Sequence, residues 1–246
     1  MKKVTASTLI CIALVLTGCS FPGASERALS KRYVSNDYPV NVTPGLSKVA
    51  LIAVDATIGR HIDLEALSTA FFVQLQSVEG LQVMPVAVPL AAVESQGLVL
   101  PRDGLKLADA LSIDGVFLAV VTDYNPYGEP SLAIGLTLFS RATSPTSPID
   151  LERVIQGGRP LEMPTSPDTQ PVVAVFGVFD ASQQTTRRKI QLYAQGQTAD
   201  AVGLGWERYY RSMPLFMRFV SYEMVWEMFD ELEVQRALRM QMKRRR

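Results

Sequence analysis

The sequence predicts an α/β sandwich, in which a mixed sheet of four or five strands is flanked by helices and followed by a C-terminal helical extension. Two observations predict this fold class. Apolar runs of strand length are interspersed with helix-periodic stretches between residues 48 and 180, and the chain beyond residue 182 is helix-periodic. With 246 residues and 48% hydrophobic content, the chain is long enough for one well-packed domain with an appended helical region.

Two continuous apolar runs predict interior strands. Residues 49–54 follow Lys48 and end at Asp55, and residues 116–121 follow the turn dipeptide Asp114-Gly115. Because neither face of these runs is polar, both faces should be covered. Residues 132–139 alternate between large and small side chains, and residues 172–179 are expected to form the last strand. Pro85 and Pro89 favour an edge position for a strand at residues 81–86.

The helices are expected between these strands and after them. Asp63 is a plausible N-cap for a helix that ends at Gly80, and a shorter helix is expected at residues 102–112. Residues 125–130 are dense in turn formers and predict a hairpin loop, whereas residues 141–171 form a long proline-rich loop. The sandwich domain is therefore expected at 47–180, and the helical region at 181–246 is broken near Pro214. Its last helix carries an apolar stripe made of Phe216, Phe219, Trp226 and Phe229.

The first residues predict a targeting segment rather than part of the fold. Lys2 and Lys3 precede an apolar stretch at residues 9–16, which is too short to cross a bilayer as a stable anchor. The motif Leu16-Thr17-Gly18-Cys19 resembles the lipobox of bacterial lipoproteins. This resemblance implies a signal peptide at 1–18, lipidation of Cys19 and a tether at 19–46. Ser20 rather than Asp after the cysteine favours the outer membrane, so we expect a lipid-anchored protein of the cell envelope that faces the periplasm.

Charge and residue inventory exclude several classes of function. Removal of Lys2 and Lys3 leaves 22 basic and 24 acidic residues, a balance that argues against nucleic acid as a partner. Cys11 and Cys19 are the only cysteines, so the mature chain has no thiol for a disulfide or a thiolate metal site. The basic tail at residues 243–246 has two explanations: it complements the end of a helix, or it contacts anionic lipid or cell-wall polymer.

Catalytic motifs are also missing from the sequence. His61 is the only histidine, no nucleophile elbow accompanies it, and one histidine cannot supply two metal ligands. Asp55, Asp114 and Asp123 follow or precede predicted strands, where they either form a carboxylate set or simply end strands and start turns. We favour the turn interpretation, and therefore expect no enzyme activity, no cofactor and no metal.

Two aromatic segments are the candidate partner-binding sites. One contains Tyr124 and Tyr127 at the predicted hairpin, and the other contains Trp206, Tyr209, Tyr210 and Arg211 before Pro214. Aromatic side chains of this kind anchor protein partners or stack on sugar rings. For the second segment we favour the alternative that its residues pack the C-terminal helices onto the sheet.

The segment from Leu107 to Tyr124, with the opening strand and helix, resembles a group of periplasm-facing lipoproteins with an anticodon-binding-domain-like sandwich. The group includes the curli-secretion lipoprotein, the lipoprotein activators of penicillin-binding proteins and a lipoprotein of exopolysaccharide export. Ser112-Ile113 stands where the group has Gly-Ala, and Ala119 where it has a strand glycine. The resemblance covers residues 47–140 and implies a non-catalytic accessory lipoprotein. Such a protein would bind an envelope protein or itself in assembly or export; the alternative is a glycan- or peptidoglycan-binding module.

Overall fold

The computed structural model describes residues 32–33, 39–41, 43–141, 170–197 and 205–244. Its five-stranded sheet has the order β2-β1-β3-β4-β5. β1 (Lys48–Asp55) pairs in parallel with β2 (Gln82–Val83) and β3 (Gly115–Asn125), whereas β4 (Ser131–Ser140) and β5 (Val173–Asp180) continue the sheet in antiparallel fashion. The predicted mixed α/β sheet is therefore confirmed. The loop predicted at 141–171 lies largely outside the described residues, as do the signal segment and Cys19.

The predicted interior strands occupy the middle of the sheet. β3 is the central strand, and β1 lies between β2 and β3. Residues 49–53 of β1 and 115–122 of β3 are buried without a break, as expected of strands that are covered on both faces. β2 is the predicted edge strand, but it has only two residues.

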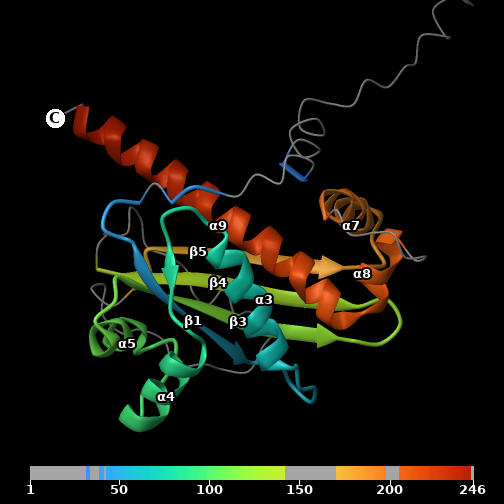
Figure 1. The fold of residues 1–246 in the computed structure, drawn as a ribbon, viewed down its shortest axis with the longest axis horizontal. Coiled ribbons are helices and arrows are strands. Elements are labelled where there is room, and N and C mark those ends of the chain that lie inside the picture. Colours follow the sequence, from blue (N-terminus) through green and yellow to red (C-terminus); the bar gives the residue numbers. More distant parts are fainter. Residues whose placement is uncertain (1–31, 34–38, 42, 142–169, 198–204, 245–246) are drawn as a thin grey trace, which may run out of the picture.

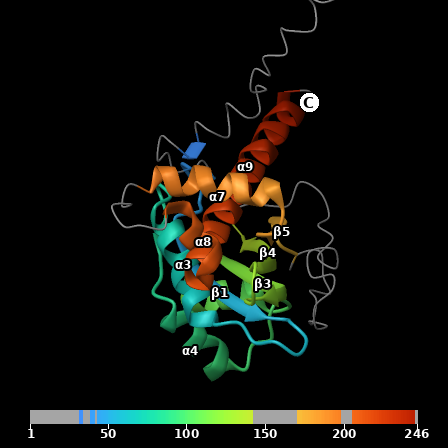
Figure 2. The same cartoon turned by 90° about the vertical axis from the view of Figure 1, so that its right-hand side faces the viewer.

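Helices cover both faces of the sheet (Figures 1 and 2). On one face α3 (Leu64–Gln76), α7 (Gln184–Gly196) and α9 (Met213–Arg244) pack over strand residues such as Leu51, Phe117 and Ile134. On the other face α5 (Gly104–Leu111) packs over Ile52 and Leu118, and α4 (Ala87–Gln96) flanks it. The C-terminal helices thus share a core with the strands instead of forming a separate unit.

The structure differs from the predicted helices at the end of α3 and in the presence of α4. The Asp63 side chain accepts a hydrogen bond from the Ala66 N–H, so it caps α3 as predicted, but the helix ends at Gln76 rather than at Gly80. α4 was not predicted at all. Its Pro89 lies in the first helical turn, where the missing N–H of proline costs no helical hydrogen bond, so this proline does not mark an edge strand as predicted.

Two residues from the predicted tether are part of the core. Tyr33 and Leu46 are each 2% exposed. The Tyr33 hydroxyl donates a 2.5 Å hydrogen bond to Glu223 of α9, and the Arg32 guanidinium lies 3.4 Å from the same carboxylate. Lys189 of α7 binds the other carboxylate oxygen at 2.8 Å. We call Arg32, Tyr33, Lys189 and Glu223 the Glu223 cluster.

Aromatic rings enclose the Glu223 cluster. The Arg32 guanidinium lies 4.8 Å from the ring centre of Trp226 and 5.4 Å from that of Tyr222, whose hydroxyl donates to the Arg32 carbonyl. Burial and the nearby Glu223 carboxylate raise the pKa of Tyr33, so its hydroxyl stays protonated as the donor. Residues 32–33 are thereby fastened to α9 and α7.

Asp103 gives a testable prediction about the layer formed by α4 and α5. Hydrogen bonds from Arg102, Lys106 and the Val99 N–H hold the pKa of this buried carboxyl well below its usual range. Since the folded-state pKa lies below that of the unfolded chain, the carboxylate stabilises the fold above about pH 4, and this stabilisation is lost as the pH falls further. We expect Asp103→Asn to lower the free energy of unfolding at pH 7 by about 2 kcal/mol.

Urea unfolding between acid and neutral pH measures this effect. The wild type should lose more stability below pH 4 than Asp103→Asn does. Asp109→Asn is the matched control, because Asp109 forms an exposed pair with Arg141 that contributes less than about 1 kcal/mol. Equal acid sensitivity of Asp103→Asn and wild type would show that another carboxylate is responsible.

Candidate functional site

The predicted hairpin loop connects β3 and β4, and its tip is open to solvent. Tyr127 is 77% exposed, which is the largest exposure among the large hydrophobic residues of the described chain. Asn125 fixes the loop by accepting a hydrogen bond from the Tyr127 N–H. Tyr124 is 8% exposed and belongs to the core, so of these two tyrosines only Tyr127 can contact a partner directly.

The second predicted segment divides in the same way. Tyr209 of α8 (Arg208–Arg211) is 5% exposed, and its ring packs edge-on against Tyr193 of α7 at 5.4 Å between centres. Tyr209 therefore packs α8 onto α7, in agreement with the packing alternative for this segment. Trp206 of η2 (Gly205–Glu207) and Tyr210 are half-buried, with ring centres 5.3 Å apart.

Arg187 of α7 joins the two segments. Its Nη2 forms an ion pair with Glu129 of the hairpin loop, and its Nε donates to the Ala181 carbonyl at 2.7 Å. Its guanidinium lies 5.8 Å from the ring centre of Tyr210. The hairpin, α7 and α8 consequently meet at one end of the molecule (Figure 1).

Arg211 completes this surface. Its guanidinium lies 5.9 Å from the Tyr210 ring centre, and it forms a 3.2 Å ion pair with Glu207 one helical turn earlier. Two guanidinium groups, from Arg187 and Arg211, thus lie within 6 Å of the Tyr210 ring and restrict its side chain. We call the resulting patch the aromatic–basic surface, and it consists of Tyr127, Glu129, Arg187, Trp206, Tyr210 and Arg211.

A hollow borders the aromatic–basic surface. It has a volume of about 460 Å³ and is lined by Trp206 together with four polar side chains: Gln184, Arg187, Arg188 and Gln191. An aromatic ring beside amides and guanidinium groups can take the edge of a protein partner or a sugar ring. Arg187 and this hollow could not be predicted, because nothing in the local sequence of α7 marks Arg187 as the neighbour of residues 129 and 210.

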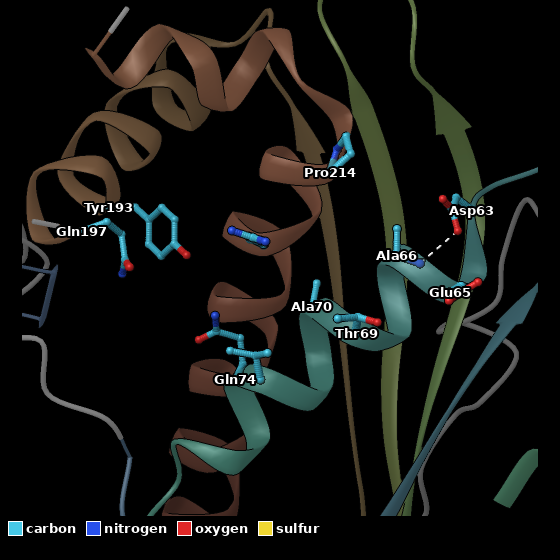
Figure 3. A pocket seen from close by; sticks show the side chains of 11 residues that line it. Asp63, Glu65, Ala66, Thr69, Ala70, Gln74, Tyr193, Gln197 and Pro214 are labelled. Carbon is cyan, nitrogen blue, oxygen red and sulfur yellow. Dashed lines mark hydrogen bonds between the residues drawn. The ribbon is translucent and has the colours of Figure 1, made fainter. Parts of the chain in front are cut away.

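A second hollow of about 530 Å³ lies between α3, α7 and α9. Figure 3 shows Tyr193 and Gln197 on the far side of this hollow from Ala70 and Gln74 of α3. Asp63 lies at its rim, where its carboxylate is engaged in capping α3. The rest of the lining mixes apolar side chains such as Val73 and Pro214 with polar ones such as Thr69 and Arg218.

The candidate catalytic residues are separated or used structurally. His61 is 85% exposed in its side chain, and its Nδ1 lies 3.3 Å from Asp55 Oδ2. Asp55 also accepts a hydrogen bond from the hydroxyl of Thr57. Thr57 is buried, so a substrate could not reach this hydroxyl. Although burial opposes it, hydrogen bonds from Thr57 and His61 lower the pKa of Asp55. In this local network the carboxylate orders a turn.

The three predicted carboxylates do not converge. Asp114 accepts hydrogen bonds from the Ser47 and Lys48 N–H groups at the start of β1, whereas Asp55 ends β1. Asp123 lies near the end of β3 and accepts from the Tyr124 N–H. Among the described residues, no group of three His, Cys, Asp or Glu side chains is placed to hold a metal ion. The helices of the described part of the chain also include none long and apolar enough to span a membrane.

No family model and no curated protein matches the chain. Similar solved structures include a lipoprotein from Neisseria meningitidis, with 11% identity, a TM-score of 0.39, and coverage of 64% of this chain and 99% of that chain. A hypothetical protein from Chlamydia trachomatis gives 14% identity, a TM-score of 0.40, and coverage of 75% of this chain and 96% of that chain. The PelC dodecamer from Paraburkholderia phytofirmans gives 12% identity, a TM-score of 0.29, and coverage of 58% of this chain and 77% of that chain. These values are too low to assign a family or a function.

Proposed function

We propose that the chain is a membrane-anchored accessory lipoprotein that binds a protein partner, or another copy of itself, in envelope assembly or export and catalyses no reaction. The aromatic–basic surface is the observation that carries this proposal. Residues 127–129 and 206–211 are far apart in the sequence, yet Arg187 contacts both groups. A composite surface of this kind suits recognition of a folded partner.

The composition of the surface favours a protein partner. Tyr, Trp and Arg are the residues most enriched among those that dominate binding energy at protein interfaces. Here Trp206 and Tyr210 support each other, and Tyr210 is restricted by Arg187 and Arg211. Side chains that are already restricted lose little conformational entropy on binding. Tyr127 adds an exposed ring at the edge of the patch.

The rest of the proposal rests on the sequence. The lipobox-like motif assigns the lipid to Cys19, which would anchor the protein in the outer membrane and face the domain towards the periplasm. The lone histidine and the dispersed carboxylates support a binding role rather than catalysis. Stable anchoring needs more than one acyl chain, as the lipobox resemblance implies for this cysteine.

Crosslinking of the native, membrane-bound protein, followed by mass spectrometry, tests this proposal. We expect a fixed envelope protein or a second copy of the chain to be captured. Trp206→Ala and Tyr210→Ala should each weaken this capture about 30-fold or more, since truncating an anchor residue commonly costs about 2 kcal/mol or more. Tyr127→Ala should have a smaller effect, because Tyr127 lies at the rim.

Leu90→Ala is the matched control for these variants. Leu90 is 42% exposed on α4, which packs on the opposite face of the sheet. Capture should be unchanged in this variant. If the three surface variants also capture partners like the wild type, the aromatic–basic surface is not the binding site.

A glycan-binding module is the second candidate, and the hollow beside Trp206 favours it. Amide and guanidinium groups around an indole ring match the hydroxyl groups and the apolar face of a sugar. Pelleting residues 20–246 with purified sacculi separates the two candidates. Retention on sacculi that Trp206→Ala abolishes, together with crosslinking that captures no protein, would favour the glycan-binding function.

A further inference from the structure

The last three turns of α9 carry an exposed apolar stripe that has no role in the core. α9 has 32 residues, so it is about 48 Å long. Figures 1 and 2 show its C-terminal end projecting past the sheet. Val234, Leu238 and Met242 are 52%, 46% and 51% exposed and follow one another at intervals of four residues. This spacing places them along one side of the helix.

Basic side chains occupy a different side of the same segment. Arg236, Arg239 and Lys243 also recur every three or four residues, and Arg244 ends the described helix. Residues 234–244 contain no acidic residue, whereas Glu227, Asp230, Glu231 and Glu233 precede them. At 100° per residue the basic row lies about 130° around the helix from the apolar row, so the end of α9 is amphipathic, with an apolar side and a largely basic side.

The helix dipole explains only part of this pattern. Basic residues in the last turn complement the negative end of a helix, and this accounts for Lys243 and Arg244. Arg236 lies about two turns before the end, where the dipole has little effect. The dipole also gives no reason for three exposed apolar residues in one row.

We propose that this C-terminal segment of α9, residues 234–244, binds the surface of a membrane that contains anionic phospholipid. An apolar side opposed by a side rich in lysine and arginine is the arrangement with which helices lie in the membrane interface. The apolar side chains enter the boundary between headgroups and acyl chains, and the basic side chains pair with lipid phosphates. The proposal does not depend on the aromatic–basic surface.

The position of residues 32–33 agrees with this orientation. The Glu223 cluster fastens them to the same helix, 11 residues before Val234. In both views they lie on the side of the sheet that α9 covers (Figures 1 and 2). A lipid attached near the N-terminus and the basic end of α9 can therefore reach one membrane surface together.

Vesicle binding of residues 20–246, which contain every described residue and no lipid anchor, tests this proposal. We expect the protein to sediment with vesicles of phosphatidylglycerol and phosphatidylcholine and to remain in solution with phosphatidylcholine alone. Each basic residue near an anionic surface contributes about fivefold to binding. Arg236→Glu combined with Lys243→Glu should thus weaken binding about 30-fold or more, and added salt should weaken it as well.

Three variants separate lipid binding from other effects. Arg236→Lys combined with Lys243→Arg should keep the binding, and Leu238→Gln should weaken it without a change of charge. Lys48→Glu combined with Arg218→Glu makes the same change of net charge at exposed positions elsewhere and should bind like the wild type. Circular dichroism checks that each variant is folded. Equal binding to neutral vesicles, or no loss with the Arg236 and Lys243 reversal, would overturn the proposal.

Discussion

Replacing Glu223 by alanine is expected to destabilise the folded chain by about 3–5 kcal/mol, as is typical when one partner of a buried ion pair is removed. The Glu223 side chain is 4% exposed and satisfies Arg32, Tyr33 and Lys189 together. Without the Glu223 carboxylate, the Tyr33 hydroxyl loses its hydrogen-bond acceptor. Arg32 then keeps its charge on a side chain that is only 18% exposed. Urea unfolding followed by circular dichroism measures the loss.

Limited trypsin digestion gives a second measurement. In Glu223→Ala, residues 32–33 should leave α9, and cleavage after Arg32 should become faster. Glu231→Ala on the same helix is the matched control and should change stability by less than about 0.5 kcal/mol, because Glu231 is only half-buried and bonds weakly to Gln235. A loss below 1 kcal/mol in Glu223→Ala would mean that the cluster contributes little to stability.

Phe219→Ala is expected to cost about 3–5 kcal/mol, the usual range for removing a buried phenylalanine ring. Phe219 is completely buried, and its ring packs against Phe179 of β5 at 5.9 Å, Tyr193 of α7 at 5.7 Å and Phe216 at 6.1 Å. It therefore joins the sheet edge, α7 and α9. The lost ring leaves a cavity between three elements that cannot all close on it.

Thermal and urea unfolding of three variants check this expectation. Phe219→Leu keeps most of the volume and should cost less than half as much as Phe219→Ala. Val234→Ala, on the exposed part of the same helix, should stay within about 0.5 kcal/mol of the wild type. Similar losses in Phe219→Ala and Val234→Ala would contradict the assigned role.

The sheet was predictable because its signals are local. The apolar runs at 49–54 and 116–121 have no polar face, so they could be assigned to interior strands without any knowledge of their neighbours. Asp63 likewise marks the start of α3, because its own side chain caps the helix. α4 escaped prediction because Pro89 is compatible with either a strand edge or the first turn of a helix.

The candidate site was only partly predictable, since its formation depends on contacts between distant residues. Tyr127, Trp206 and Tyr210 could be selected by residue type, but Arg187, which links them, contacts Glu129 from 58 positions away. Residue type also could not show that Tyr124 and Tyr209 are buried. The Glu223 cluster did leave a local signal. An acidic residue stands between Phe219 and Trp226 on the apolar stripe of α9, where a charge needs a buried partner.

The fastening of residues 32–33 to α9 sets how far the domain can move from its lipid. If the whole predicted tether at 19–46 were free, the domain could reach about 95 Å from the bilayer at about 3.5 Å per residue. Arg32 follows Cys19 by 13 residues, so with the lipid on Cys19 the reach falls to about 45 Å. The volume that the domain explores shrinks by about the cube of that ratio, and its effective concentration at the membrane rises about tenfold. A partner in the same bilayer would therefore meet this domain more often, with no added contact between them.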